Sequence, residues 1–456
     1  MKNLMTCVPV AGGGTERTPV ENLLLTRGVL LANNIRFLLI RTADGTPALA
    51  LGEQFRGLVA PLLRVDGGPG AITIEYWDFG PEEVRCPRPN ALTRTSFPAA
   101  DLELSTIRRF GCDWVSPEGM FEPHAGDIGF PIDLVFSWVD GNDPALAARR
   151  TAAAVGVAFG EGDAAPARTR QIDELRFALR SVHEYAPWVR RIFIATDSTP
   201  PRWLADDPKV TIVRAAEHFS DPSSLPTFNS HAIESQLQHI PGLSEHFIYA
   251  NDDMFFGRPV SPEMFFTSGG ISRFVESDLR IGTGPNTEQR SGFENGARVN
   301  RKLLQDRFGQ VITRHLEHAP TPLRRSVLLE MEREFPADFA RTQASPFRSS
   351  TDISVTNSLF HYYALLTGRA VRHETAWVRY VDTTTFDGLD QLGILSVRRD
   401  ADFFCLNDSS FPEVEESHRT SRVRCFLEHY FPRPAPWERT AAELIDTAAE
   451  SGTFAA

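Results

Sequence analysis

Two acidic turns that follow apolar segments are the first candidates for chemistry. Asp252 and Asp253 follow the run 246–250 after one residue, Asn251, and Asp140 opens the turn DGNDP after the run 132–139. Carboxylate oxygens are the ligands that Mg²⁺ and Mn²⁺ prefer, and a diphosphate can complete their coordination. Asp, Asn and Gly also form ordinary turns through local hydrogen bonds. Neither turn by itself distinguishes a ligand-binding site from an ordinary turn. Two acidic strand ends in one sheet favour a ligand-binding site.

A histidine and an arginine farther along the chain add a proton acceptor and an anion-binding group. His315 and His318 lie just before a proline, and an imidazole that titrates near neutrality is the usual proton acceptor from a sugar hydroxyl. A lone histidine is more often structural. Arg348 can bind a phosphate through two parallel hydrogen bonds. The alternative for Arg348 is an ordinary surface ion pair.

The segment 404–408 (FCLND) again places polar side chains after an apolar run. Asn407 and Asp408 are the candidate ligands there, whereas Cys405 is expected to be packed rather than reactive. The sequence contains no GxxxxGK[ST] motif and no GxGxxG that follows a strand. A P-loop and a dinucleotide-binding fingerprint are therefore both disfavoured.

The elements that must position these side chains form an alternating pattern from residue 132 onward. Strands are predicted at 132–139, 191–196, 210–215 and 246–250, and helices at 172–185, 230–239, 323–335 and 353–367. Strands separated by helical lengths predict a mostly parallel sheet with helices on both faces, which is a Rossmann-like α/β core. Ligands of such sheets bind at the carboxyl ends of the strands, where both acidic turns fall.

The chain divides by composition into a small module and a larger domain. Residues 1–125 predict a β-rich or α+β accessory module, with β-type runs at 29–40 and 71–79 between turn signals. Residues 126–440 form the predicted catalytic domain. Within it, 268–312 is rich in Gly, Asn, Ser and Arg and is predicted to be a long irregular insertion. A last helix at about 441–450 and a tail to 456 complete the prediction.

Composition and charge exclude several classes of protein. The 456 residues, 42% of them hydrophobic, are enough for a large core, and the formal net charge of −12 disfavours nucleic acid as the main ligand. The five cysteines form no CxxC motif, which indicates a reducing compartment. Neither a signal peptide nor a membrane-spanning segment is visible in the sequence. We therefore expect a cytoplasmic protein, and peripheral association with an assembly at the inner face of a membrane stays open.

Four blocks of this sequence, in this order, resemble the Stealth family of sugar-phosphate transferases. The first is 132–144 (IDLVFSWVDGNDP). The second comprises 174–204, 225–234 (LPTFNSHAIE) and 247–266 (FIYANDDMFFGRPVSPEMFF). The third and fourth are 318–367 and 405–438. The first 125 residues and the segment 268–312 lie outside the resemblance.

The resemblance implies a reaction. A Stealth enzyme transfers a hexose 1-phosphate, or an N-acetylhexosamine 1-phosphate, from a UDP-sugar to a hydroxyl of a glycan or glycolipid and releases UMP. Bacterial capsule and exopolysaccharide phosphotransferases and the lysosomal-enzyme N-acetylglucosamine-1-phosphotransferase share this reaction. Because attack on phosphorus leaves the glycosidic carbon untouched, the anomeric configuration of the donor should be retained.

The resemblance also assigns roles to individual residues. Asp140, Asp252 and Asp253 match donor or metal positions, the metal being Mg²⁺ or Mn²⁺. His318 matches the base, since Thr321 stands where some relatives carry a second histidine.

The remaining matches concern substrate contacts. Arg348 and Asn407 match phosphate-contacting positions, and Asn229, Glu234 and Asp408 are further expected substrate-binding residues. For Glu234 the alternative is a favourable charge in the first turn of a helix.

Two other functions remain open on the sequence. A metal-dependent glycosyltransferase would use the same carboxylates but attack carbon, which leaves no phosphorus in the product linkage. A noncatalytic polysaccharide-binding or scaffold protein is the second alternative, and the presence of every candidate polar residue argues against it.

Overall fold

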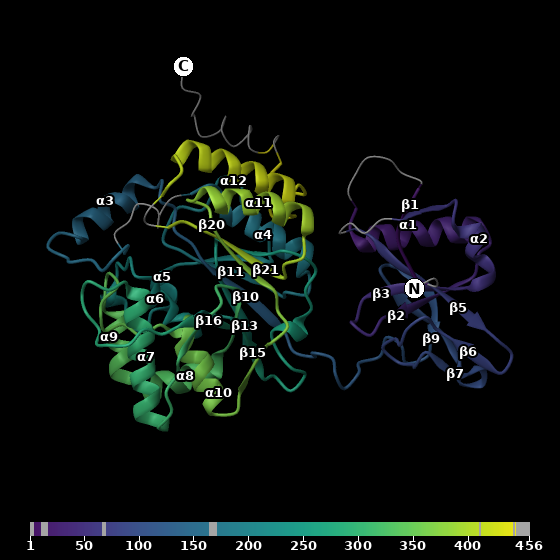
Figure 1. The fold of residues 1–456 in the computed structure, drawn as a ribbon, viewed down its shortest axis with the longest axis horizontal. Helices are drawn as coiled ribbons and strands as arrows, with labels where there is room; N and C mark the ends of the chain where they lie inside the picture. The colour runs from purple at the N-terminus through teal and green to yellow at the C-terminus, as the bar shows by residue number, and fades with distance from the viewer. Residues whose placement is uncertain are drawn as a thin grey trace, which may run out of the picture. The chain divides into compact units, whose positions relative to one another are not determined.

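The chain folds into two compact units, Met1–Ala125 and Gly126–Ala456 (Figure 1). The computed structural model describes residues 4–10, 17–65, 70–163, 171–409, 412–440 and 443. The division falls where the composition of the sequence changes. The helix expected at about 441–450 lies outside the described residues except for Glu443.

The N-terminal unit is an α+β module built on one sheet. Its strand order is β2-β3-β5-β1-β4, and β6 and β7 extend the sheet from β5. The strands are β1 Leu4–Pro9, β2 Phe37–Arg41, β3 Pro47–Gly52, β4 Leu63–Val65, β5 Ile72–Phe79, β6 Glu83–Arg85 and β7 Ser96–Pro98. The short helix α2 (Arg56–Val59) and the hairpin β8 (Leu104–Arg109) and β9 (Cys112–Pro117) complete the unit.

The prediction of a β-type run at 29–40 is wrong for the first residues of that run. The helix α1 (Pro19–Ala32) extends through them, and β2 begins only at Phe37. Thr18 and Glu21 form a reciprocal capping box that starts this helix. Because the helix is apolar on several sides, its sequence lacks the helical periodicity that distinguishes a helix from a strand.

The larger unit is built on a five-stranded sheet of order β12-β11-β10-β13-β18. The strands are β10 Ile132–Ser137, β11 Ile192–Ala195, β12 Val210–Val213, β13 His246–Asn251 and β18 Thr321–Arg324. The first four run parallel, and β18 pairs antiparallel with β13. Ser137 is in register with Ala195 on one side and Asn251 on the other, so the carboxyl ends of three strands meet at one edge.

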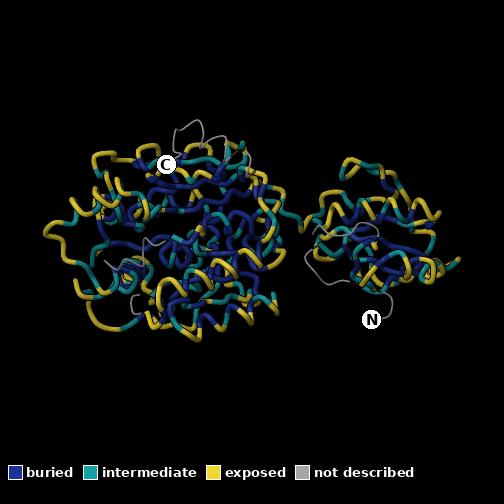
Figure 2. The backbone as a smooth tube through the Cα atoms, turned by 90° about the horizontal axis from the view of Figure 1, so that it is seen from above, coloured by how far each residue is buried: buried dark blue, intermediate teal, exposed yellow. Residues whose placement is uncertain are grey.

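Helices cover both faces of this sheet, as the near-continuous apolar strands require. Helices α4 (Glu174–Tyr185), α11 (Phe386–Arg398) and α12 (Glu416–Tyr430) share one apolar cluster with Leu134 and Phe136. Helices α7 (Gly292–Phe308), α8 (Arg325–Glu334), α9 (Pro336–Gln343) and α10 (Phe360–Leu366) share the other with Val135 and Phe193. The two helix layers lie on opposite sides of the strands in Figure 1, and in Figure 2 the buried backbone lies in the interior of this unit.

A second, smaller sheet packs beside the carboxyl edge and brings the segment 403–407 to it. Its order is β14-β21-β20, with β14 Met254–Phe256, β20 Val378–Asp382 and β21 Phe403–Asn407. Strand β14 begins right after Asp253 and pairs antiparallel with β21, where Met254 faces Cys405. This pairing places Cys405 next to the acidic turn that follows β13.

The segment 268–312, expected to be irregular, contains regular structure. It holds β15 (Ser272–Phe274), β16 (Glu276–Arg280) and the 17-residue helix α7. Ser291 caps the start of α7, and Gly309 ends it at a positive φ of 69°. The helix buries Asn295 and Asn300, whose side chains bond to backbone carbonyl groups. A helix that buries amides lacks the continuous apolar stripe by which helices are predicted.

Three predicted helices have different boundaries. The helix expected at 230–239 is α6 (Ser230–Glu234) followed by a 3₁₀ turn, and the one at 323–335 begins only after β18. The helix expected at 353–367 opens with a π-helical turn, Val355–Leu359, before α10. The other short elements are α3 Pro144–Ala153, α5 Ala215–His218, β17 Arg314–Leu316 and β19 Ala370–Arg372.

Candidate active site

Asp253 is the point at which three distant segments of the chain meet. Its Oδ1 lies 3.8 Å from Nε2 of His318, and the Cys405 thiol donates a hydrogen bond to its Oδ2 at 3.4 Å. The backbone oxygen of Asp253 also accepts a hydrogen bond from the amide of Leu406 at 3.0 Å. The turn after β13, the turn before β18 and the strand β21 therefore form one site.

His318 is placed to exchange a proton with a ligand at this edge. It lies in the turn between β17 and β18, and 29% of its side chain is exposed. His315 is different, because it is buried and stacks on Phe293 with ring centroids 4.4 Å apart. Burial lowers the pKa of His315, which keeps it neutral. Of the two candidates named from the sequence, His318 is the one at the acidic turn.

Asp252 and Asp253 form a pair of carboxylates that suits a divalent cation. Burial, Asp253 and Glu174, in that order, raise the pKa of Asp252 well above its ordinary value. Oδ1 of Asp253 is buried and accepts no hydrogen bond from any described residue. Two adjacent carboxylates with an unused buried oxygen fit Mg²⁺ or Mn²⁺, which prefer oxygen ligands.

Gln171 joins the two acidic turns, and sequence reasoning missed it. Its Nε2 donates to the backbone oxygen of Val139 at 2.8 Å and to Oδ2 of Asp252 at 3.3 Å. Its Oε1 accepts a hydrogen bond from the indole of Trp138 at 3.1 Å. No pattern in the sequence marks this residue, because its partners lie 33 and 81 positions away.

Asp140 lies half-buried in the other acidic turn, after β10. Its backbone amide donates to Ser198, and its Oδ1 accepts from the amide of Asn142, both at 2.9 Å. Asp143 caps α3 by accepting from the amides of Ala145 and Leu146. The DGNDP segment thus forms both the local turn that its composition indicates and a carboxylate at the edge of the sheet.

Glu234 lies beneath the surface of the site and contacts other protein groups. It is 3% exposed, and burial raises its pKa. Thr356 donates a hydrogen bond to it at 2.7 Å, and Tyr249 donates at 3.3 Å. The Tyr249 hydroxyl also lies 2.7 Å from Oγ of Ser137 at the end of β10. Through its buried contact with Tyr249, Glu234 therefore connects α6 to the carboxyl edge of the sheet.

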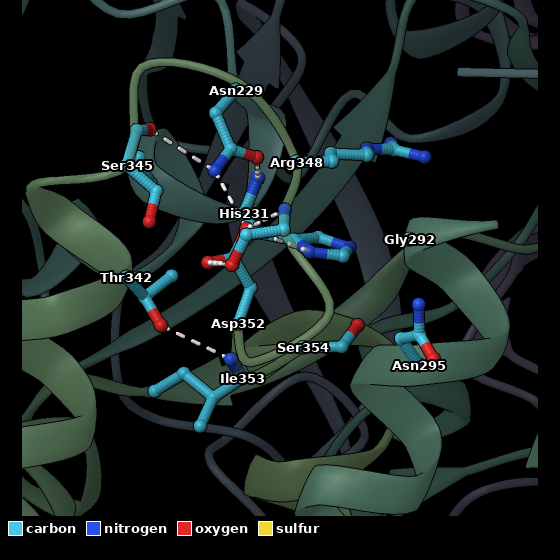
Figure 3. A network of polar contacts seen from close by, with 12 residues as sticks. Asn229, His231, Gly292, Asn295, Thr342, Ser345, Arg348, Asp352, Ile353 and Ser354 are labelled. Carbon is cyan, nitrogen blue, oxygen red and sulfur yellow. Dashed lines mark hydrogen bonds and ion pairs between the residues drawn. The ribbon is translucent and has the colours of Figure 1, made fainter. Parts of the chain in front are cut away.

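Arg348 is held on three sides. Its Nη2 donates to Oγ of Ser230 at 2.7 Å, and its Nη1 lies 3.5 Å from Oδ1 of the buried Asp163. A Cβ at Gly292 would lie 2.7 Å from Cδ of Arg348, so only glycine leaves room for the stem of this arginine. Figure 3 shows Arg348 beside the polar network that supports its loop.

Asn229 supports that loop instead of facing a substrate, contrary to expectation. It is fully buried, and its Nδ2 donates to the backbone oxygens of Ser345 and Phe347 and to Oδ2 of Asp352 (Figure 3). Its Oδ1 accepts from the amide of His231. With its amide group engaged in this way, Asn229 fixes the segment that carries Arg348.

Asn407 and Asp408 end β21 with different surroundings. Oδ2 of Asp408 lies 3.3 Å from Nη1 of Arg419, and this ion pair is buried. The backbone oxygen of Asn407 accepts hydrogen bonds from Thr383, and its side chain is half-buried at the end of β21. The ion pair gives Asp408 a structural contact, whereas Asn407 is still available to a ligand.

Cys405 is buried, as expected. Burial, followed by the charge of Asp253, raises the pKa of its thiol well above the ordinary value. The protonated thiol is the donor in the hydrogen bond to Asp253. Its position beside the acidic turn is not visible in the sequence.

Carboxylates, a histidine and an arginine around the carboxyl edge of a mostly parallel sheet define an α/β enzyme with a polar active site. The chain belongs to the Stealth family. Stealth protein conserved regions 1, 2, 3 and 4 match residues 130–154, 168–274, 317–365 and 393–447. The resemblance drawn from the four sequence blocks is thereby confirmed.

Relatives of similar length carry one name. An exopolysaccharide phosphotransferase of Nocardia farcinica is 57% identical over 455 residues, covering 95% of this chain and 90% of the relative. The exopolysaccharide phosphotransferase CpsY of Mycobacterium leprae is 60% identical over 474 residues, covering 93% and 88%. A crystal structure of the galactosyltransferase LgtC covers 67% of this chain and 98% of its own with a TM-score of 0.34 and 11% identity, too distant to support any conclusion.

Within the described residues, no helix is both long and apolar enough to cross a membrane.

Proposed function

We propose that this chain is an exopolysaccharide phosphotransferase that moves a hexose 1-phosphate from a UDP-sugar to a hydroxyl of a glycan or glycolipid. The observation that carries the proposal is the 3.8 Å approach of His318 to Asp253 at the carboxyl edge. A proton acceptor beside carboxylates that suit a diphosphate-bound cation would serve transfer of a phosphoryl group to a hydroxyl, which supports the proposal. The relatives named exopolysaccharide phosphotransferase support the same reaction class.

The proton and the electrons move as follows. Nε2 of His318 accepts the proton of the acceptor hydroxyl, and the oxygen of that hydroxyl forms a bond to the β-phosphorus of the donor. The bond from that phosphorus to the bridging oxygen breaks, and UMP leaves with the electron pair. The sugar carbon keeps its bond to oxygen, so the donor configuration is retained.

Arg348 stabilises the charge that develops on the phosphoryl oxygens. Ser230 and Asp163 engage one terminal nitrogen each and hold the guanidinium plane, which leaves further N–H groups for phosphate oxygens. Preorganised donors of this kind need no rearrangement during the reaction. Mg²⁺ or Mn²⁺ held by Asp252 and Asp253 would neutralise charge on the diphosphate.

Phosphorus-31 NMR tests the proposal directly. The protein is incubated with a panel of UDP-sugars, Mg²⁺ or Mn²⁺ and oligosaccharide acceptors, and both the product and the released nucleotide are identified. We expect a phosphodiester in the product and UMP as the nucleotide. Release of UDP with a phosphorus-free product would replace the proposal with glycosyl transfer.

A further inference from the structure

A carboxylate, an imidazole and a thiol converge at the candidate active site. Asp253, His318 and Cys405 each offer one ligand atom, and these three atoms all lie within 4.8 Å of one another. Asp253 is central, with one oxygen 3.8 Å from His318 and the other 3.4 Å from Cys405. Among the described residues, this is the group of three His, Cys, Asp or Glu side chains that lie close enough together to share one metal ion.

The separations are close to those of a zinc site. Zinc bonds of about 2.0–2.3 Å in a tetrahedron place neighbouring ligand atoms roughly 3.3–3.7 Å apart. Side-chain shifts on the order of 1 Å would bring all three atoms to these distances. Cys405 is fixed on β21, whereas His318 lies in a turn and is partly exposed. Three protein ligands with solvent access on the histidine side leave a fourth position for water.

The donor set distinguishes this site from one for magnesium. Mg²⁺ takes oxygen ligands, whereas sulfur, nitrogen and oxygen together are the ligands of Zn²⁺. Oδ1 of Asp253, buried and without a hydrogen bond from any described residue, is available to a cation.

We propose that Asp253, His318 and Cys405 bind Zn²⁺, and that bound zinc inhibits the transferase. Zinc replaces the thiol proton of Cys405, which leaves to solvent, and occupies the lone pair of His318. A zinc-bound imidazole cannot accept a proton from the acceptor. Asp253 is also withdrawn from the pair it forms with Asp252. The inhibitory part rests on the proposed function, whereas the binding part does not.

Cobalt spectroscopy tests binding without any enzymatic assay. Co²⁺ is titrated into tag-free protein in thiol-free buffer, and Zn²⁺ is then added to displace it. We expect a thiolate-to-cobalt band in the near ultraviolet together with the visible bands of tetrahedral cobalt, all abolished by Zn²⁺. Cys405→Ser should lose the thiolate band, whereas Cys425→Ser, which changes an exposed cysteine, should keep it.

Calorimetry with Zn²⁺ provides a second measurement and a second variant. Loss of a residue that only hydrogen-bonds to a metal ligand weakens metal binding by roughly 10- to 100-fold. His318→Asn and Cys405→Ser each remove a ligand itself, so each should weaken zinc binding by more than that. Circular dichroism checks that each variant is folded. Absence of a thiolate band in the unmodified protein, or equal zinc affinity in folded His318→Asn, would overturn the site.

Inhibition is measured as Mg²⁺-supported UMP release against Zn²⁺ concentration, with each variant compared with its own zinc-free rate. The midpoint of inhibition should rise by more than roughly 10- to 100-fold in Cys405→Ser, matching its loss of affinity, and stay unchanged in Cys425→Ser. A cobalt band without zinc inhibition would keep the site and overturn its inhibitory role. Failure of transfer under every zinc-free condition would instead contradict the proposed function, since the spectra do not depend on turnover.

Discussion

The side-chain amide of Gln171 donates a hydrogen bond to Asp252 across a separation of 81 residues, with Nε2 and Oδ2 3.3 Å apart. The same nitrogen donates to the backbone of Val139, next to Asp140. One amide thus sets the position of one acidic turn relative to the other. Because both turns belong to the candidate active site, small displacements there should affect turnover.

Gln171→Glu should lower kcat by roughly 10- to 100-fold with the fold intact. The carboxylate keeps the acceptor for Trp138 but loses the hydrogen bonds that the amide donates to the carbonyl of Val139 and to Asp252. A hydrogen bond to a charged group is worth about 1.5–3 kcal/mol, and one to a neutral carbonyl about 0.5–1.5 kcal/mol. The substitution also places a third negative charge beside Asp252. Steady-state kinetics of Gln171→Glu and of the exposed Gln310→Glu measure the effect. Equal rates for the two variants would leave Gln171 without a role in the site.

Asp252→Asn and Asp253→Asn should each reduce turnover by about 10³-fold. A bound metal supplies several kcal/mol of charge stabilisation, and each 1.4 kcal/mol is a factor of ten in rate. EDTA should reproduce the loss in the unmodified protein, and added Mg²⁺ or Mn²⁺ should reverse it. Full activity in metal-free buffer would remove the metal from the mechanism.

Arg348→Lys should remain impaired by about 10- to 100-fold although its charge is kept. An ammonium group cannot reproduce the planar fork that engages two phosphate oxygens, and it cannot reach Ser230 and Asp163 at once. The comparison is the exposed Arg333→Lys, which should retain full activity. Wild-type kinetics for Arg348→Lys would reduce Arg348 to a source of positive charge.

His318→Ala should lower kcat by about 10²- to 10⁴-fold and change donor affinity little, because general-base assistance acts in the chemical step. His418→Ala, at an exposed position of α12, is the control. His315 is unsuitable, because its replacement removes the stack on Phe293. An active His318→Ala protein would transfer the role to another group, such as Asp140, since Glu234 is buried and bound to Thr356 and Tyr249.

Acid should destabilise the larger unit through His361, which is fully buried on α10. Burial lowers its pKa from the ordinary 6.5 to about 3. Between these values the unfolded chain binds a proton that the folded chain excludes, so the free energy of unfolding falls as pH falls. One such group accounts for up to about 1.4 kcal/mol per pH unit. His361→Leu should therefore lose less Tm than the unmodified protein between pH 7.5 and 5.0, measured by differential scanning fluorimetry. An identical loss in both proteins would contradict this account.

The apolar strands and the turns that follow them were determined by the sequence alone. Runs such as 132–137 and 246–251 are buried on both faces, so most of their residues are apolar and their position needs no tertiary information. The acidic turns come next in the chain, and parallel pairing then brings both to one edge. The residues of the Stealth blocks identified the family for the same local reason, since each block is a continuous segment.

Contacts between distant segments were decided only by the tertiary structure. Cys405 reaches Asp253 because β21 pairs with β14, and nothing local to either residue specifies that pairing. Asn229 is of a residue type that often binds ligands, yet the fold buries it against residues 345–352. Helix α7 escaped prediction because it buries amides whose partners, such as the backbone of Ser354, are supplied by another segment. Hydrogen bonds and burial depend on what packs against a residue, and a single sequence records only its neighbours along the chain.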